Sequence, residues 1–356
     1  MAPQSVIDSH VHLWPKETSN ESGHAWMTPP DMPLAKPHLS KDYLKASSQG
    51  AGVNGGSITV EAVVFVETDV RYETPTGDVS SWARGPLDEV GFLRDCVEGQ
   101  YDPRDSDLLQ GLVPWAPMDQ STPVLEEYLA LAEQRAGPET WRRVKGFRFL
   151  LQSIKDEENF RDLVLGHNFI SNLKLLGKRG FSFDIGLDQH RAGSFQLEIF
   201  IQAMRMAHDD VSSQQQVVFI ANHLCKPLYG EQSSVAFKEW KDAITAMSKV
   251  SKTYMKLSGQ FSELDDHHLS AADDAANLIK LWVKHILQTF GPERVMFGSD
   301  WPVCNVSGPS KEHSWMDWSR VVQTLVDDDI TLTTRDKDRI WRDTAIEAYR
   351  LRPAQR

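Results

Sequence analysis

Eight short apolar runs alternate with longer stretches of helical periodicity along this chain of 356 residues. The runs occupy residues 5–11, 58–68, 108–116, 142–151, 180–187, 216–223, 253–259 and 294–300. Several are apolar almost throughout, which is typical of parallel strands covered on both faces. The stretches between them, such as residues 122–136, repeat apolar residues at three- and four-residue steps, which indicates amphipathic helices. This alternation predicts an α/β fold, a (β/α)8 TIM barrel, rather than an open doubly wound sheet.

Two regions extend beyond a bare barrel. Residues 14–38 are rich in proline, glycine and polar residues and carry no periodicity. Because this insertion follows the first strand, it belongs to the loops over the barrel mouth, and we expect a lid or a pocket wall. Residues 333–351 predict an extra C-terminal helix beyond the barrel. No linker or repeat divides the chain, so residues 1–356 are expected to form a single domain.

The charge balance favours a small-molecule partner. Lys and Arg total 38 against 50 Asp and Glu, a formal net charge of −12, which disfavours binding to nucleic acid or anionic membranes. No apolar run approaches the roughly 18 residues of a membrane span. The cysteines, Cys96, Cys225 and Cys304, are too widely spaced for a disulfide framework and suit a reducing compartment. With no secretory pattern at the N-terminus, we expect a cytoplasmic protein, and its oligomeric state is left open.

Two histidines stand one residue apart at the end of the first run, in VIDSHVHLWP. Side chains two apart on a strand point to the same face, so His10 and His12 are expected to converge. A pair of neutral imidazoles suits a metal ion. A buried polar pair without a metal is equally compatible, so the pair alone leaves both interpretations open.

Polar residues also close most of the other strands, and in a TIM barrel the functional groups lie at the carboxyl ends of the strands. In chain order these residues are Glu67, Arg148, Asp184, His223, Lys256 with Ser258, and Asp300. The third strand ends near Trp115, which with Trp301 is expected at the pocket. Chance would leave most strand ends apolar, so the set indicates a functional site.

Each residue of this set also has a purely structural interpretation. His223 is compatible with a hydrogen-bonded core histidine, and Asp300 with a turn residue. Glu67 is compatible with a surface ion pair to Arg71, and Arg148 with an ion pair inside the barrel. The functional interpretation therefore depends on the whole set.

Two further features receive no functional assignment. GAGVNG, Gly50–Gly55, matches the dinucleotide pattern G-x-G-x-x-G, but a helical segment precedes it and a strand follows, the reverse of what pyrophosphate binding needs. A helix end and a turn are the preferred interpretation. His267 and His268, beside acidic residues, are interpreted as a solvated helix start.

The ordered motifs DSHVHLW, VKGFRFLLQ, NHLCKP, YMKLSG and VMFGSDWPV resemble the amidohydrolase-related family of the amidohydrolase superfamily. Within it they are most similar to the sugar lactonases, such as the L-rhamnono- and L-fuconolactonases. The resemblance implies one divalent metal ion per chain, zinc by preference or manganese, held by His10, His12, His223 and Asp300. Lys145 lies too early in its strand to be the carbamylated lysine of two-metal members.

The resemblance also implies a reaction, in which metal-activated water opens a sugar-acid lactone, similar to L-rhamnono-1,4-lactone, to the linear aldonic acid. Asp300 is then the general base, with His223 as a second catalytic group. Arg148 and Lys226 are expected to bind the developing oxyanion or a substrate carboxylate. The remaining expected substrate-binding residues are Lys256, Glu67, Trp115 and Trp301, with Glu67 also considered as an additional metal ligand.

Two alternatives remain from the sequence. The first is a metal-dependent decarboxylase of an aromatic or muconate-type acid, since related barrels share the ligand set. The second is a non-catalytic ligand-binding barrel, which the complete set of four ligands disfavours.

Overall fold

The computed structural model describes residues 4–48, 58–264 and 271–352. Each of the eight predicted runs contains a strand, so this part of the prediction is confirmed. The strands are β1 (Gln4–Val11), β2 (Ile58–Val66), β3 (Leu109–Val113), β4 (Gly146–Arg148), β5 (Ser182–Ile185), β6 (Val218–Ala221), β7 (Thr253–Leu257) and β8 (Val295–Phe297).

All neighbouring strands pair in parallel, in the order β1-β2-β3 and β4-β5-β6-β7-β8. Parallel bridges Leu112↔Val144 and Trp115↔Arg148 join the β3 side to the β4 side. On the opposite side, Val11 at the end of β1 bridges to Trp301, just after β8. The strands therefore follow one another around a ring, as expected of a (β/α)8 barrel.

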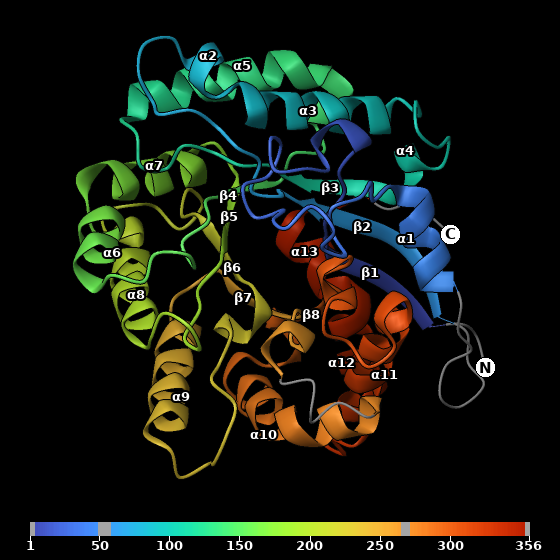
Figure 1. Cartoon of the computed structure of the whole chain (residues 1–356). Coiled ribbons are helices and arrows are strands. Elements are labelled where there is room, and N and C mark those ends of the chain that lie inside the picture. Colours follow the sequence, from blue (N-terminus) through green and yellow to red (C-terminus); the bar gives the residue numbers. More distant parts are fainter. Residues whose placement is uncertain (1–3, 49–57, 265–270, 353–356) are drawn as a thin grey trace.

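Helices cover the outside of this ring (Figure 1). They are α1 (Ser40–Ser48), α2 (Val79–Trp82), α3 (Arg84–Val97), α4 (Asp105–Leu108), α5 (Thr122–Trp141), α6 (Glu157–Val164), α7 (His167–Lys178), α8 (Phe195–His208), α9 (Val235–Ser248), α10 (Ala272–Phe290) and α11 (Ser314–Asp327). Their apolar faces pack on the outward faces of the strands. Phe183 of β5, for example, lies 5.8 Å from Phe169 of α7 and 6.2 Å from Phe200 of α8, measured between ring centroids. The predicted amphipathic pattern thus accounts for the outer core.

The C-terminal segment differs from the single helix expected beyond the barrel. It consists of α12 (Thr334–Asp338), a π-helical turn (Arg339–Asp343) and α13 (Thr344–Tyr349). The buried side chains of α13 pack with strand residues such as Ile7, Val64 and Met296. Because this cluster is separate from the outer core, the extra helix packs against the inside of the barrel (Figure 1).

The insertion 14–38 is a closed loop with a small core of its own. Trp14 and His38 pair at its base through two backbone hydrogen bonds of 3.0 Å each. Trp14, Met27 and Leu34 are buried together. The loop is tied to the end of β2 by His24 Nε2, which lies 2.8 Å from Thr68 Oγ1. The insertion is therefore well packed, although its sequence shows no periodicity.

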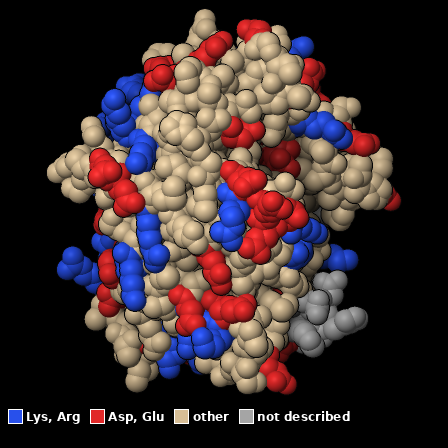
Figure 2. Space-filling model, turned by 90° about the vertical axis from the view of Figure 1, so that its left-hand side faces the viewer, with Lys and Arg blue, Asp and Glu red and all other residues tan. Residues whose placement is uncertain are grey.

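The remaining expectations concern other features of the sequence. Gly50–Gly55, His267 and His268 lie outside the described residues. Among the residues that the structure describes, no helix is long and apolar enough to cross a membrane. All three cysteines are free and buried. On the face shown in Figure 2, acidic and basic side chains are interspersed.

Candidate metal centre and active site

Two backbone contacts place the loop after β8 against the end of β1. Asp300 N donates to His10 O over 2.9 Å, and His12 N donates to Trp301 O over 2.8 Å. The backbone of Asp300 is left-handed, with φ of 61°, a conformation that aspartate tolerates better than most residues. These contacts bring the Asp300 carboxylate to the two histidines.

The four predicted ligands converge on one point. His10 Nε2 and His12 Nε2 are 3.2 Å apart. Asp300 Oδ1 lies 3.3 Å from His12 Nε2, 3.6 Å from His10 Nε2 and 3.7 Å from His223 Nε2. Atoms that bind one zinc ion at roughly 2.0–2.2 Å in a tetrahedron lie about 3.4 Å apart. Ligand atoms of His10, His223 and Asp300 all lie within 4.8 Å of one another, so these three residues fit a single divalent cation. His12 lies beside them, next to His10 and Asp300, and the four residues are called the histidine cluster.

The protonation states of His10, His223 and Asp300 also suit a cation. Burial lowers the pKa of His223 to about 3. Burial, followed by the charge of Lys256, lowers the pKa of His10 well below its usual value. At Asp300, burial raises the pKa, but His223 and His12 outweigh it and leave a net lowering. Neutral imidazoles beside an ionised carboxylate are the state that binds a divalent ion.

Hydrogen bonds to the outer nitrogens orient two of the rings. His12 Nδ1 lies 2.8 Å from Val66 O, an acceptor only, so Nδ1 carries the proton and Nε2 presents its lone pair. His223 Nδ1 lies 2.8 Å from Ser258 Oγ. The next residue, Gly259, has a φ of +66°, and a Cβ there would overlap the His223 ring. The motif LSG at the end of β7 therefore both holds His223, through Ser258, and leaves room for its ring, at Gly259.

Lys256 contacts the third ring, that of His10, at its outer nitrogen. Its Nζ lies 3.1 Å from His10 Nδ1 and 2.7 Å from Asp184 Oδ2, which also accepts from Tyr349 Oη over 2.7 Å. Burial lowers the pKa of Lys256 despite the opposing charge of Asp184. Lys256, predicted to bind substrate, thus lies beneath the histidine cluster.

A pocket of about 360 Å³ opens beside the histidine cluster. Its polar side chains include His12, Asp69, Arg148, His223, Lys226 and Asp300. Its apolar wall is formed by Trp14, Trp26, Leu34, Leu150 and Val303. Three of these wall residues belong to the insertion 14–38, so the insertion forms part of this substrate pocket.

The structure brings Arg148 and Lys226 to the substrate pocket, but Glu67 lies behind Arg148. Arg148 Nε donates to Glu67 Oε1 over 2.5 Å, and Glu67 Oε2 accepts from Asp69 N over 2.5 Å. Both carboxylate oxygens are thus engaged away from the histidine cluster. This geometry argues against Glu67 as a metal ligand, and Arg71 contacts Glu21 rather than Glu67.

The two tryptophans expected at the substrate pocket are placed elsewhere. Trp115 packs among aromatic rings, 4.6 Å from Tyr72 and 5.4 Å from Tyr128 between centroids. Trp301 packs 5.3 Å from His38 and lines a different hollow. Trp14 and Trp26 line the substrate pocket instead of Trp115 and Trp301, because the insertion folds over the barrel mouth.

A sequence profile described as Amidohydrolase matches residues 7–351. The chain belongs to the amidohydrolase family. The match begins in β1, just before the histidine pair, and ends after α13, so it covers the whole barrel.

Two curated amidohydrolase relatives cover nearly the full length. L-rhamnono-gamma-lactonase of Scheffersomyces stipitis is 26% identical over 99% of this chain and 100% of its own. L-fucono-1,5-lactonase of Burkholderia multivorans is 25% identical over 97% of this chain and 96% of its own.

Solved structures of other proteins share the fold. A crystal structure of an amidohydrolase from Burkholderia multivorans with bound zinc has a TM-score of 0.72 and 22% identity, covering 98% of this chain and 99% of its own. 2,6-Dihydroxybenzoate decarboxylase from Rhizobium has a TM-score of 0.53 and 12% identity, covering 98% of this chain and 99% of its own. These likenesses support the barrel architecture of the amidohydrolase chain.

Sequence reasoning missed Asp8, which fixes the loop that carries Asp300. Asp8 Oδ1 accepts from Ser299 N over 2.8 Å, and Oδ2 accepts from Tyr43 Oη and Trp315 Nε1, each over 2.9 Å. The signal was a carboxylate two residues before His10 in the same apolar run.

Sequence reasoning also missed Asp69, which lines the substrate pocket. Burial and the charge of Glu67 raise the pKa of Asp69 to about 6. Its signal was weaker, because an aspartate just after a strand is also an ordinary turn residue.

Proposed function

We propose that this amidohydrolase is a lactonase that opens a sugar-acid lactone, similar to L-rhamnono-1,4-lactone, to the linear aldonic acid. The observation that carries the proposal is the convergence of His10, His12, His223 and Asp300 beside a pocket with two cationic side chains. The two lactonase relatives, aligned over nearly their full lengths, favour a cyclic ester as substrate.

We infer that the histidine cluster holds one divalent ion, with zinc preferred because of the imidazole-rich donor set and manganese as the second candidate. Zinc in the similar Burkholderia multivorans structure supports this inference. When bound, such an ion lowers the pKa of water and polarises a carbonyl oxygen.

Asp300 accepts the proton of the attacking water, because its lowered pKa keeps the carboxylate ionised. The water oxygen adds to the lactone carbonyl carbon. The bond from that carbon to the ring oxygen then breaks, and the ring oxygen takes up the proton held by Asp300, which leaves a hydroxy acid and returns Asp300 to its ionised form. His223 is placed as the second catalytic group, because its Nε2 lies 3.7 Å from Asp300 Oδ1.

Arg148 and Lys226 bind the oxygen atoms of the substrate. The buried ion pair with Glu67 fixes the Arg148 guanidinium, so its charge is already in place before substrate binds. Lys226 is held by Glu263, with Nζ 3.3 Å from Oε1. Trp14 and Trp26 offer flat faces against which a sugar-like ring packs.

A decarboxylase is the second candidate, because Arg148 and Lys226 also suit a substrate carboxylate. The shared fold with 2,6-dihydroxybenzoate decarboxylase agrees with both candidates. A non-catalytic barrel is disfavoured because all four proposed ligands are present in the sequence and lie close together.

The deciding experiment is a panel of sugar-acid lactones and aromatic acids, with acid release and CO2 release measured on one preparation of known metal content. We expect acid release from L-rhamnono-1,4-lactone or a close isomer and no CO2 from any acid. CO2 release without lactone opening would favour the decarboxylase.

A further inference from the structure

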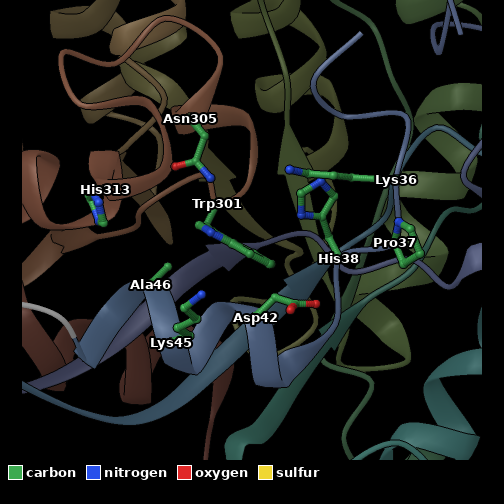
Figure 3. Close-up of a pocket in the computed structure, with 9 residues that line it drawn as sticks. All are labelled: Lys36, Pro37, His38, Asp42, Lys45, Ala46, Trp301, Asn305 and His313. Atoms are coloured by element: carbon green, nitrogen blue, oxygen red, sulfur yellow. The ribbon is translucent and has the colours of Figure 1, made fainter. Parts of the chain in front are cut away.

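A second hollow, of about 280 Å³, lies beside the loop that carries Asp300 (Figure 3). Its polar lining consists mainly of Lys36, His38, Asp42, Lys45, Trp301 and Asn305. These side chains come from the end of the insertion, from α1 and from the loop after β8. The linings of this outer hollow and of the substrate pocket share no residue.

The outer hollow carries an excess of positive charge. Lys36 and Lys45 face it, and neither forms an ion pair with another residue in the described part of the chain. The carboxylate of Asp42 is also present, where it accepts from Leu39 N over 3.1 Å at the start of α1. Two ammonium groups against one carboxylate favour a ligand with one negative charge.

Two buried polar atoms in the lining lack partners. His38 is 5% exposed and Trp301 is 2% exposed. Neither His38 Nε2 nor Trp301 Nε1 has a hydrogen-bond partner among the described residues. Buried polar atoms are almost always paired, and a bound molecule is an ordinary explanation for an exception. Burial lowers the pKa of His38 to about 3, so its ring is a neutral hydrogen-bonding group.

We propose that the outer hollow is a second binding site for a small polyhydroxy carboxylate. Its carboxylate pairs with Lys36 and Lys45, while its hydroxyl groups donate to Asp42 and accept from Trp301 Nε1. Asp42 disfavours a bare anion but suits a ligand that also carries hydroxyl donors. The ligand class is that of the product in the proposed lactonase reaction, on which this choice rests.

The outer hollow and the substrate pocket share a wall. Trp14 lines the substrate pocket and is paired with His38 of the outer hollow, their ring centroids 4.9 Å apart. Trp14 Nε1 also donates to Lys36 O over 2.7 Å. A ligand that pairs with Lys36 therefore contacts the same short segment, Lys36 to His38, that packs against Trp14. Binding in the outer hollow therefore changes the affinity of the substrate pocket for its ligand. By thermodynamic linkage, binding in the substrate pocket changes the affinity of the outer hollow by the same factor.

Calorimetric titration with sodium L-rhamnonate tests the site. The wild-type protein is expected to bind two equivalents per chain, one in each cavity. In Lys45→Gln, the second site is expected to weaken by about tenfold or more, since a charge-assisted hydrogen bond is lost. Lys41→Gln is the matched control, because Lys41 lies exposed on the same helix outside the lining, and it is expected to keep both sites.

The outcomes separate this site from the proposed function. If the chain is not a lactonase, the substrate pocket does not take L-rhamnonate, and the wild type binds one equivalent that Lys45→Gln still weakens. No binding, or binding that Lys45→Gln leaves unchanged, overturns the second site. Inorganic phosphate is titrated in parallel, and equal affinity for phosphate overturns the assignment to a hydroxy acid.

Discussion

Lys256 Nζ lies 3.1 Å from His10 Nδ1, on the edge of the imidazole that faces away from the histidine cluster. The same nitrogen forms an ion pair with Asp184, and both side chains are 0% exposed. Lys256 therefore joins the histidine cluster to a fully buried carboxylate in the barrel interior.

We therefore expect Lys256→Met to destabilise the fold by about 3–5 kcal/mol, since it leaves the buried Asp184 charge uncompensated. The double variant Lys256→Met with Asp184→Asn removes both charges and is expected to recover at least half of this loss. Urea unfolding of the metal-free proteins measures both. Equal stability of the two variants would show that the loss comes from packing and not from the unpaired charge.

Gly259→Ala is expected to weaken metal binding by about 10–100-fold, because the added methyl displaces the His223 ring from its position. The matched control is Gly180→Ala. Gly180 also has a positive φ, of +78°, but nothing lies within 4 Å of the added carbon. Both variants lose about 1 kcal/mol to the backbone. Metal affinity measured against a chelator distinguishes them, and similar losses in both variants would contradict the role of Gly259.

Glu89 predicts a pH-dependent stability. Its Oε1 accepts from Thr68 N over 3.0 Å and Thr68 Oγ1 over 2.6 Å, while burial and the charge of Glu67 raise its pKa from 4.5 to about 8. Between these values the folded protein retains a proton that the unfolded chain has lost, so this group lowers stability as the pH rises through that window.

Glu89→Gln removes this titration while keeping a carbonyl oxygen for Thr68. We expect the free energy of unfolding of the variant to exceed that of the wild type by an amount that grows from pH 5 to pH 8, up to about 4 kcal/mol. Chemical unfolding at several pH values checks this. A difference independent of pH would mean that Glu89 does not titrate in this range.

The insertion supplies the next prediction. Trp26 lines the substrate pocket and donates from Nε1 to Thr68 O over 3.0 Å. We propose that its ring packs on the substrate, so Trp26→Ala is expected to raise KM about tenfold and to change kcat by less than about threefold. Trp26→Phe keeps a flat face, so its KM is expected to lie between those of the wild type and Trp26→Ala. An unchanged KM in Trp26→Ala for every lactone would remove the insertion from substrate selection.

The strands and the polar residues at their ends could be predicted because both depend on local pattern. His10 and His12 share a face of β1, and Asp300 ends the last apolar run, so their convergence follows from the barrel itself. The depth of a side chain inside the barrel could not be predicted in this way. Lys256 and Ser258 belong to one strand end, yet Lys256 points to Asp184 while Ser258 holds His223.

The walls of the substrate pocket could not be predicted, because they depend on contacts between residues that are distant in the sequence. Trp14 and Trp26 face the substrate pocket because His24 and Arg71 tie the insertion to the end of β2. No periodicity in residues 14–38 predicts those contacts. The same holds for Tyr349, which reaches Asp184 across 165 positions of the chain only because α13 packs inside the barrel.

Asp300→Asn is expected to abolish turnover while leaving the fold and much of the metal binding intact. The amide keeps the size of the side chain and one oxygen that can bind a cation, and three imidazoles remain. What the amide lacks is the capacity to accept a proton from water. Loss of a general base costs about 10²–10⁴ in rate, or about 3–5 kcal/mol.

The measurement is kcat on the best lactone, with the metal content determined in the same sample. Full metal occupancy with kcat reduced at least about a hundredfold supports Asp300 as the base. A loss below tenfold at full occupancy would assign the proton transfer to another group, of which Asp69 is the strongest candidate because it lines the same pocket with a pKa of about 6. If the variant loses both the metal and its activity, the three histidines are insufficient to hold the ion. Asp300 would then be assigned the role of a metal ligand and not that of the base.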